Sequence, residues 1–143
     1  MVVVSHHVPV PPERVFAVLA DGWSYASWVV GAAHIRQVDG HWPAVGSRIH
    51  HSVGPWPVHV QDVSTVVAVE PGSVLELDAR MWPVGGARIR LTLHADAGGT
   101  RIEMAEKLTR GPLRLLPKAL QTPLLAPRNV EALKRLADIA VNR

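Results

Sequence analysis

Residues 87–108 read ARIRLTLHADAGGTRIEMAEKL, and this stretch decides the fold. Apolar and polar residues alternate on both sides of a glycine pair, Gly98–Gly99, as in two half-buried strands. Residues 96–99 are the expected hairpin loop. The stretch therefore predicts an antiparallel hairpin with one face toward a core.

Further strands are expected on the N-terminal side of this hairpin. Each is a short segment rich in apolar residues at alternate positions and bounded by glycine, proline or polar residues. They cover Val2–Val8, His34–Val38, Arg48–Val53, residues 56–69 and residues 75–80. With the hairpin they make seven strands of one antiparallel sheet.

Two short helices are expected after the first strand, and one long helix at the end. Pro11, Pro12 and Glu13 suit a first helical turn, and a second helix is expected over Ser24–Val29. From Pro127 onward apolar residues recur at helical spacing, whereas the prolines within residues 112–123 are expected to interrupt any regular helix. We therefore predict one α+β domain over residues 1–143, with a curved sheet wrapped on the final helix and a hollow between them.

The turn at Gly54–Pro55 sets a predicted register. A two-residue loop makes paired residue numbers sum to 109. His51 then faces the core beside Ile49, while His50 and His59 become neighbours on the outer face.

Composition excludes several classes of protein. The chain has 143 residues, of which 48% are hydrophobic and 19% charged, so it is not disordered. It has no cysteine, which excludes disulfides and thiol chemistry. Its apolar runs fall short of the roughly 20 residues that a membrane span needs. The N-terminus does not resemble a signal peptide, so a cytoplasmic location is expected.

Positive charge is concentrated near the C-terminus. Residues 101–143 hold nine Lys or Arg against four Asp or Glu, within a net charge of +3. A solvated helix face explains this excess most simply. The alternative is peripheral contact with anionic lipid or docking on a partner through the basic C-terminal helix. Nucleic acid is not an expected partner.

Glu106 breaks the alternation of the last strand. It falls on the face of Ile102 and Met104, where an apolar residue is expected, so its carboxylate must be paired, hydrated or neutral. Asn129 occupies a similar position on the apolar stripe of the C-terminal helix, and Arg128 beside it is a candidate partner for Glu106. Glu106 is interpreted either as a ligand-binding or acid–base group, or as a structural ion pair.

His51 is the second candidate for chemistry, since it faces inward on an otherwise apolar strand. A lone histidine there is more often a core residue than a catalyst. The chain has eight histidines but no H-x-x-x-H or H-E-x-x-H motif, so neither a metal nor a cofactor is expected.

Five tryptophans against one phenylalanine and one tyrosine suggest that large flat side chains line a cavity. Each of them could equally be an ordinary core residue. They are Trp23, Trp28, Trp42, Trp56 and Trp82.

Several short motifs, taken in order, resemble the START-like, Bet v 1-like (SRPBCC) superfamily, and within it the polyketide cyclase/dehydrase and lipid-transport branch. They span nearly the whole chain: PPERVFAVLAD at 11–21, YAxWVVG at 25–31, WPxxGS at 42–47, VEPG at 69–72, GGTRI at 98–102 with Glu106, and RNxExL at 128–133.

The resemblance implies the helix-grip fold, in which a seven-stranded antiparallel sheet curls around a long C-terminal helix and two short helices close one end. It implies a deep apolar cavity between sheet and helix. It leaves function open, because members include lipid carriers, hormone receptors, aromatase/cyclases and chaperone cofactors. The prolines before Pro127 depart from the family pattern and leave the start of the long helix unsettled.

The leading hypothesis is a protein that binds or carries a small to medium hydrophobic ligand, such as a lipid or polyketide. One alternative is a cyclase/dehydratase-like enzyme that uses Glu106 or His51 as acid or base. Another is an interaction module that docks through the basic helix. The oligomeric state is left open. The predicted ligand-binding residues are Trp28, His51, Trp56, Leu77, Ile89, Met104, Glu106, Asn129 and Leu133.

Overall fold

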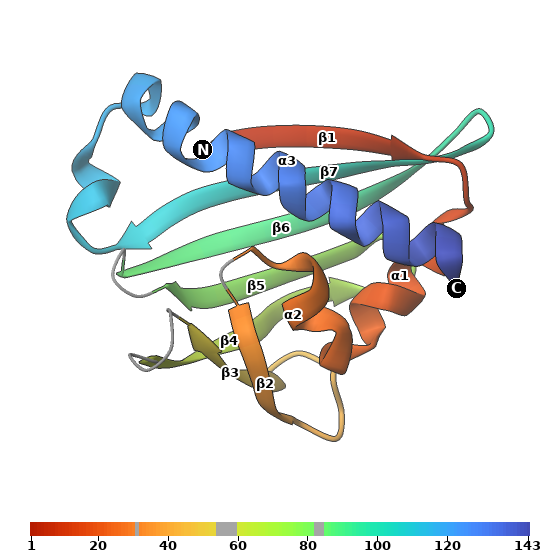
Figure 1. The fold of residues 1–143 in the computed structure, drawn as a ribbon, viewed down its shortest axis with the longest axis horizontal. Helices are drawn as coiled ribbons and strands as arrows, with labels where there is room; N and C mark the ends of the chain where they lie inside the picture. Colours follow the sequence, from red (N-terminus) through yellow and green to blue (C-terminus); the bar gives the residue numbers. More distant parts are fainter. Residues whose placement is uncertain (31, 54–59, 82–84) are drawn as a thin grey trace.

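The computed structural model describes residues 1–30, 32–53, 60–81 and 85–143 and confirms the predicted order of helices and strands (Figure 1). The elements are β1 (Val2–Val8), α1 (Pro12–Ala20), the 3₁₀ turn η1 (Gly22–Ser24), α2 (Tyr25–Trp28), β2 (Ala32–Val38), β3 (Arg48–Val53), β4 (Val60–Glu70), β5 (Val74–Met81), β6 (Gly85–Asp96), β7 (Gly99–Arg110), the 3₁₀ turn η2 (Pro112–Leu115) and α3 (Lys118–Asn142).

The seven strands form one antiparallel sheet in the order β1-β7-β6-β5-β4-β3-β2. The first strand thus joins the last, which places both edges of the sheet in the N-terminal half of the chain. Helix α3 runs across one face beside β1 and β7, and α1 and α2 cover the same face farther along (Figure 1). This is the predicted helix-grip architecture.

Helix α3 begins at Lys118, nine residues before the predicted start at Pro127. Pro123 and Pro127 lie inside it. Each removes one backbone donor, but both are exposed, so water can solvate the carbonyl groups that lose their partners. The buried side of the helix, which holds Gln121 and Leu125, continues without a break into Asn129 and Leu133. Packing of this side outweighs the local cost of the prolines.

The predicted register between β3 and β4 is wrong. The observed pairs run from Arg48↔Thr65 to Val53↔Val60, so paired numbers sum to 113 and six residues, 54–59, separate the strands. The predicted two-residue turn placed Pro57 inside a strand, although proline lacks the N–H that pairing with a neighbouring strand needs. His50 therefore pairs with Val63, and His59 and the Gly54–Pro55 turn lie outside the described residues. Because the shift is an even number, Ile49 and His51 still face the core, and both are buried.

The inner face of the sheet is arranged in cross-strand rows. Leu77 pairs with Ile89, and Ile89 pairs with Glu106, so three predicted site residues lie side by side on adjacent strands. Met104 lies two residues before Glu106 in the next row. Directly paired residues share a face, so Glu106 is surrounded by apolar neighbours.

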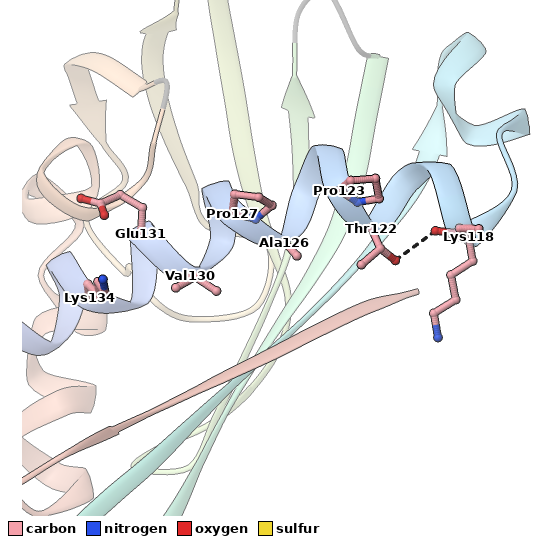
Figure 2. Close-up of a pocket in the computed structure, with 9 residues that line it drawn as sticks. Lys118, Thr122, Pro123, Ala126, Pro127, Val130, Glu131 and Lys134 are labelled. Carbon is pink, nitrogen blue, oxygen red and sulfur yellow. Dashed lines mark hydrogen bonds between the residues drawn. The ribbon is translucent and has the colours of Figure 1, made fainter.

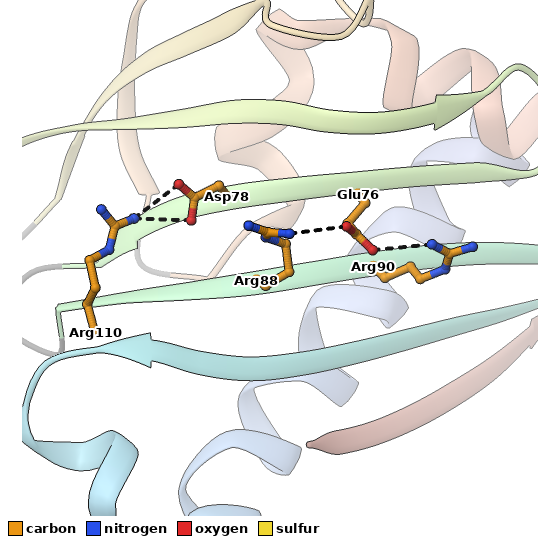
Figure 3. A network of polar contacts seen from close by, with 5 residues as sticks. All are labelled: Glu76, Asp78, Arg88, Arg90 and Arg110. Atoms are coloured by element: carbon orange, nitrogen blue, oxygen red, sulfur yellow. Dashed lines mark hydrogen bonds and ion pairs between the residues drawn. The ribbon is translucent and has the colours of Figure 1, made fainter.

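The outer face carries the complementary charges (Figure 3). Glu76 accepts hydrogen bonds from Arg88 at 3.5 Å and from Arg90 at 3.2 Å, and Asp78 binds Arg110 at 3.1 Å. All five side chains come from the three neighbouring strands β5, β6 and β7. The network is partly exposed and satisfies the charges of a solvent-facing sheet, so it is no candidate site.

Candidate functional site

Glu106 is fully buried and binds two side chains of α3. Arg128 Nη2 donates to Oε1 at 3.0 Å and to Oε2 at 2.8 Å, and Asn129 Nδ2 donates to Oε1 at 2.7 Å. Arg128 retains 26% exposure of its side chain, whereas Asn129 is 4% exposed. The strand and the helix are therefore joined at this point by a charge-assisted cluster inside an apolar surrounding.

The cluster limits what Glu106 can do chemically. Both of its oxygens already accept hydrogen bonds, and a guanidinium balances its charge. A buried carboxylate held in this way is fixed in place by its hydrogen bonds. The geometry favours a positioning role over that of a general base.

A second polar cluster joins α2 to strands β3 and β4. The Tyr25 hydroxyl lies 2.7 Å from Ser64 Oγ, and Ser64 Oγ lies 3.2 Å from His51 Nε2. All three residues are buried, and the Tyr25 and His51 rings pack with their centroids 5.5 Å apart. The other ring nitrogen, His51 Nδ1, is buried and has no hydrogen-bond partner among the described residues.

Burial raises the pKa of Tyr25 to about 12, and the negative charge of Glu106 adds to this effect. Tyr25 therefore remains protonated. If its hydroxyl donates to Ser64 and Ser64 donates to His51, both hydroxyl protons have an acceptor, so we assign this direction. Ser64 then donates to His51 Nε2, which leaves the proton of the neutral imidazole on Nδ1. The second cluster thus presents one unpartnered N–H donor to the protein interior.

His51 is expected to make stability depend on pH. Burial lowers the pKa of His51, so the folded protein keeps it neutral while the unfolded chain binds a proton below about pH 6.5. Stability that is present at neutral pH should therefore be lost as pH falls below this value, at no more than about 1.4 kcal/mol per pH unit. Urea unfolding at several pH values checks this: His51→Gln should depend less steeply on pH than the wild type. Equal slopes would contradict it.

The apolar candidates of the predicted site lie on the inner side of the fold. Trp28, Leu77, Met104 and Leu133 are buried, and Ile89 is partly buried against the same core. Trp28 packs edge-on against Tyr25, with ring centroids 5.4 Å apart. Trp56 and Trp82 lie outside the described residues, Trp42 is partly buried and Trp23 is 60% exposed.

Sequence reasoning missed Tyr25 and Ser64 as members of a polar cluster. Ser64 is 39 residues from Tyr25 in the chain, and the wrong register did not pair it with Ile49 of β3. Its signal was the alternation with Val66, which puts both side chains on one side of β4. Across residues 1–30, 32–53, 60–81 and 85–143, no three His, Asp or Glu side chains converge in a way that would hold a metal ion.

A surface groove of about 950 Å³ lies along the outward side of α3 (Figure 2). It is open to solvent and contains none of the predicted ligand-binding residues. Its lining comes from α3 alone: Lys118, Ala119, Thr122, Pro123, Ala126, Pro127, Val130, Glu131 and Lys134. The groove is thus separate from the two interior clusters.

Solved structures with the same fold support the architecture. "Ara h 8.0201" matches with a TM-score of 0.72 and 15% identity over 99% of this chain and 97% of that one. Protein MLL2253 from Mesorhizobium loti gives 0.74 and 20%, over 99% and 96%. The di-domain ARO/CYC StfQ from the steffimycin biosynthetic pathway gives 0.73 and 13%, over 99% of this chain and 50% of that one. Identities this low show the fold alone.

The fold defines a helix-grip protein of the Bet v 1-like class. The chain belongs to the family described as polyketide cyclase/dehydrase and lipid transport, whose model matches residues 1–140. No curated protein matches the sequence. No helix among the described residues is both long and apolar enough to cross a membrane.

Proposed function

We propose that the protein binds a small to medium hydrophobic ligand between the inner face of the sheet and α3. The observation that carries the proposal is the unpartnered, buried Nδ1 of His51. A buried polar atom without a partner costs free energy, so its persistence favours a ligand that supplies one. Family membership agrees with such a role.

The chemistry of the clusters narrows the ligand class. Because Nδ1 is assigned as a donor, the ligand should offer an oxygen acceptor, such as a carbonyl or hydroxyl group. The neighbouring surface is apolar, with Trp28, Leu77, Ile89, Met104 and Leu133 as its proposed contacts. Glu106 and Asn129 are held in place by the hydrogen bond between them, and would orient the ligand. A mainly apolar molecule with one or a few oxygens, as in a lipid or polyketide, fits this description.

Native mass spectrometry after mild purification tests the proposal. A co-purified molecule should be present in the wild type and about tenfold less tightly bound in His51→Gln, since one hydrogen bond to the ligand is lost. His50→Gln is the matched control, because His50 is the next residue of β3 and faces the other side. If neither native spectra nor organic extraction yields a ligand, or if both variants bind equally, the proposal fails.

A second candidate function follows from the Tyr25–Ser64–His51 chain. In a cyclase or dehydratase, the Nδ1 N–H could stabilise the enolate oxygen of a bound β-hydroxy carbonyl ligand while solvent takes up the α proton and the β-hydroxyl leaves as water with a proton from solvent. Tyr25 and Ser64 would hold the imidazole ring in place through their hydrogen bonds. This role predicts that the bound molecule loses water in the presence of the wild type but stays intact with Tyr25→Phe. Binding without conversion by both proteins would favour a carrier.

A further inference from the structure

Three large aliphatic side chains project into solvent where α3 begins. Leu115 on η2 is 78% exposed, and Leu120 and Leu124 on α3 are 53% and 57% exposed. Leu120 and Leu124 are one helical turn apart and so lie on the same side of α3. We call these three residues the leucine ridge. Clustered exposed leucines of this kind mark an interaction surface more often than a bare solvent face.

The chain segment that carries the ridge has charges of one sign. Residues 107–130 contain five Lys or Arg and no Asp or Glu. Two of the five are paired: Arg110 with Asp78, and Arg128 with Glu106. Arg114 and Lys118, which flank the ridge, are exposed and have no ion pair among the described residues.

Two of the three cations within residues 131–143 are paired within the protein, and Lys134 is the third. Arg135 pairs with Glu131, and Arg143 pairs with Asp21. The basic surface available for docking is therefore narrower than the whole C-terminal segment. It centres on η2 and the first turns of α3.

The ridge is held on a fixed support. Gln121 is buried, and its Nε2 lies within hydrogen-bonding distance of the carbonyl oxygens of Leu113, Arg114 and Leu116, at 3.3, 3.3 and 2.8 Å. Leu113 also packs against buried Leu125 and its neighbours. These contacts fasten η2 to α3 at one end of the molecule (light blue, Figure 1). The leucines and cations are thus presented together without a further folding step.

We propose that this surface docks on membranes that contain anionic lipid. The leucine ridge enters the boundary between headgroups and acyl chains, and Arg114 and Lys118 contact lipid phosphates. Protruding aliphatic side chains flanked by unpaired cations fit an anionic bilayer better than a protein, which would need a matching concave surface. The groove residues Ala119 and Pro123 are the chain neighbours of Leu120 and Leu124 on α3. The proposal does not depend on the interior ligand site.

Vesicle flotation tests the charge requirement. The wild type should bind phosphatidylcholine vesicles that contain phosphatidylserine, should bind pure phosphatidylcholine weakly or not at all, and should dissociate as salt rises. Arg114→Gln/Lys118→Gln should lower the partition constant about 30-fold. The control Arg90→Gln/Arg101→Gln removes the same charge from the outer face of the sheet and should have a small effect. Absence of wild-type binding, or equal losses in both variants, overturns the proposal.

A spectroscopic probe tests insertion of the ridge. Because the chain has no cysteine, Leu120→Cys can be labelled at one position with an environment-sensitive fluorophore. Its emission should shift to the blue with anionic vesicles. The same label at Val45→Cys should not shift, since Val45 is 64% exposed in the loop between β2 and β3, on the other side of the molecule (Figure 1). Absence of a shift at position 120 overturns the proposal.

Substitution of the leucines separates a membrane from an acidic protein partner. Leu120→Ser/Leu124→Ser should reduce vesicle binding at least tenfold while leaving the melting temperature near that of the wild type, because both side chains are exposed. If this variant binds as the wild type does, the surface recognises charge alone. That result overturns membrane docking in favour of an acidic protein surface.

Discussion

Replacing Arg128 with methionine is expected to destabilise the fold by about 3 kcal/mol at neutral pH, because it leaves the carboxylate of Glu106 buried without its counter-charge. Asn129 remains as one donor to Glu106 but supplies no positive charge. Chemical denaturation measures the loss.

Three variants serve as controls. Arg135→Met removes an exposed arginine of the same helix and should change the free energy of unfolding by less than about 0.5 kcal/mol. Adding Glu106→Gln to Arg128→Met should recover most of the loss. Glu106→Leu alone should cost less than Arg128→Met, because the arginine left behind can turn toward water. If Arg128→Met and Arg135→Met are equally mild, the ion pair does not hold the helix to the sheet.

The inward position of Glu106 follows from local pattern alone. In β7 the side chains alternate, so a residue two positions from Met104 and two from Leu108 must share their face, and the structure leaves Glu106 with no exposed surface. Asn129 follows in the same way from helical spacing. That Arg128 and Asn129 pair with Glu106 was one of several partnerships open from sequence, and the docking of α3 on the sheet decides among them.

The pattern of apolar and polar residues within one strand or helix does not predict contacts between elements that are distant in the chain. The hydrogen bond between Tyr25 and Ser64 needs both the register of β4 and the placement of α2, and the register was mispredicted by four residues. Helix α3 is a second case, in which the local sequence predicted a shorter helix than the one observed. The local cost of Pro123 is real, yet burial of Gln121 and Leu125 on the other side of the helix extends it to Lys118.

The Tyr25–Ser64–His51 cluster gives the second large effect: Ser64→Ala is expected to cost about 3 kcal/mol, far more than loss of a hydroxyl usually does. Among the described residues, Ser64 is the only hydrogen-bond partner of two buried groups, the Tyr25 hydroxyl and His51 Nε2. Its removal leaves both without a hydrogen bond, at about 1–3 kcal/mol each. Tyr25→Phe should cost about 1 kcal/mol, since Ser64 can still bind His51.

This cluster is tested by comparing the stability of a double variant with that of Ser64→Ala. Tyr25→Phe/Ser64→Ala should be more stable than Ser64→Ala alone, because the second substitution removes one of the two stranded groups. Ser73→Ala is the control, since the Ser73 hydroxyl lies at a turn and makes only exposed hydrogen bonds, and it should change stability by less than about 0.5 kcal/mol. Urea denaturation of the wild type and the four variants measures all of these differences. If the double variant is less stable than Ser64→Ala, Ser64 does not link Tyr25 to His51, and the donor assigned to His51 Nδ1 loses its basis.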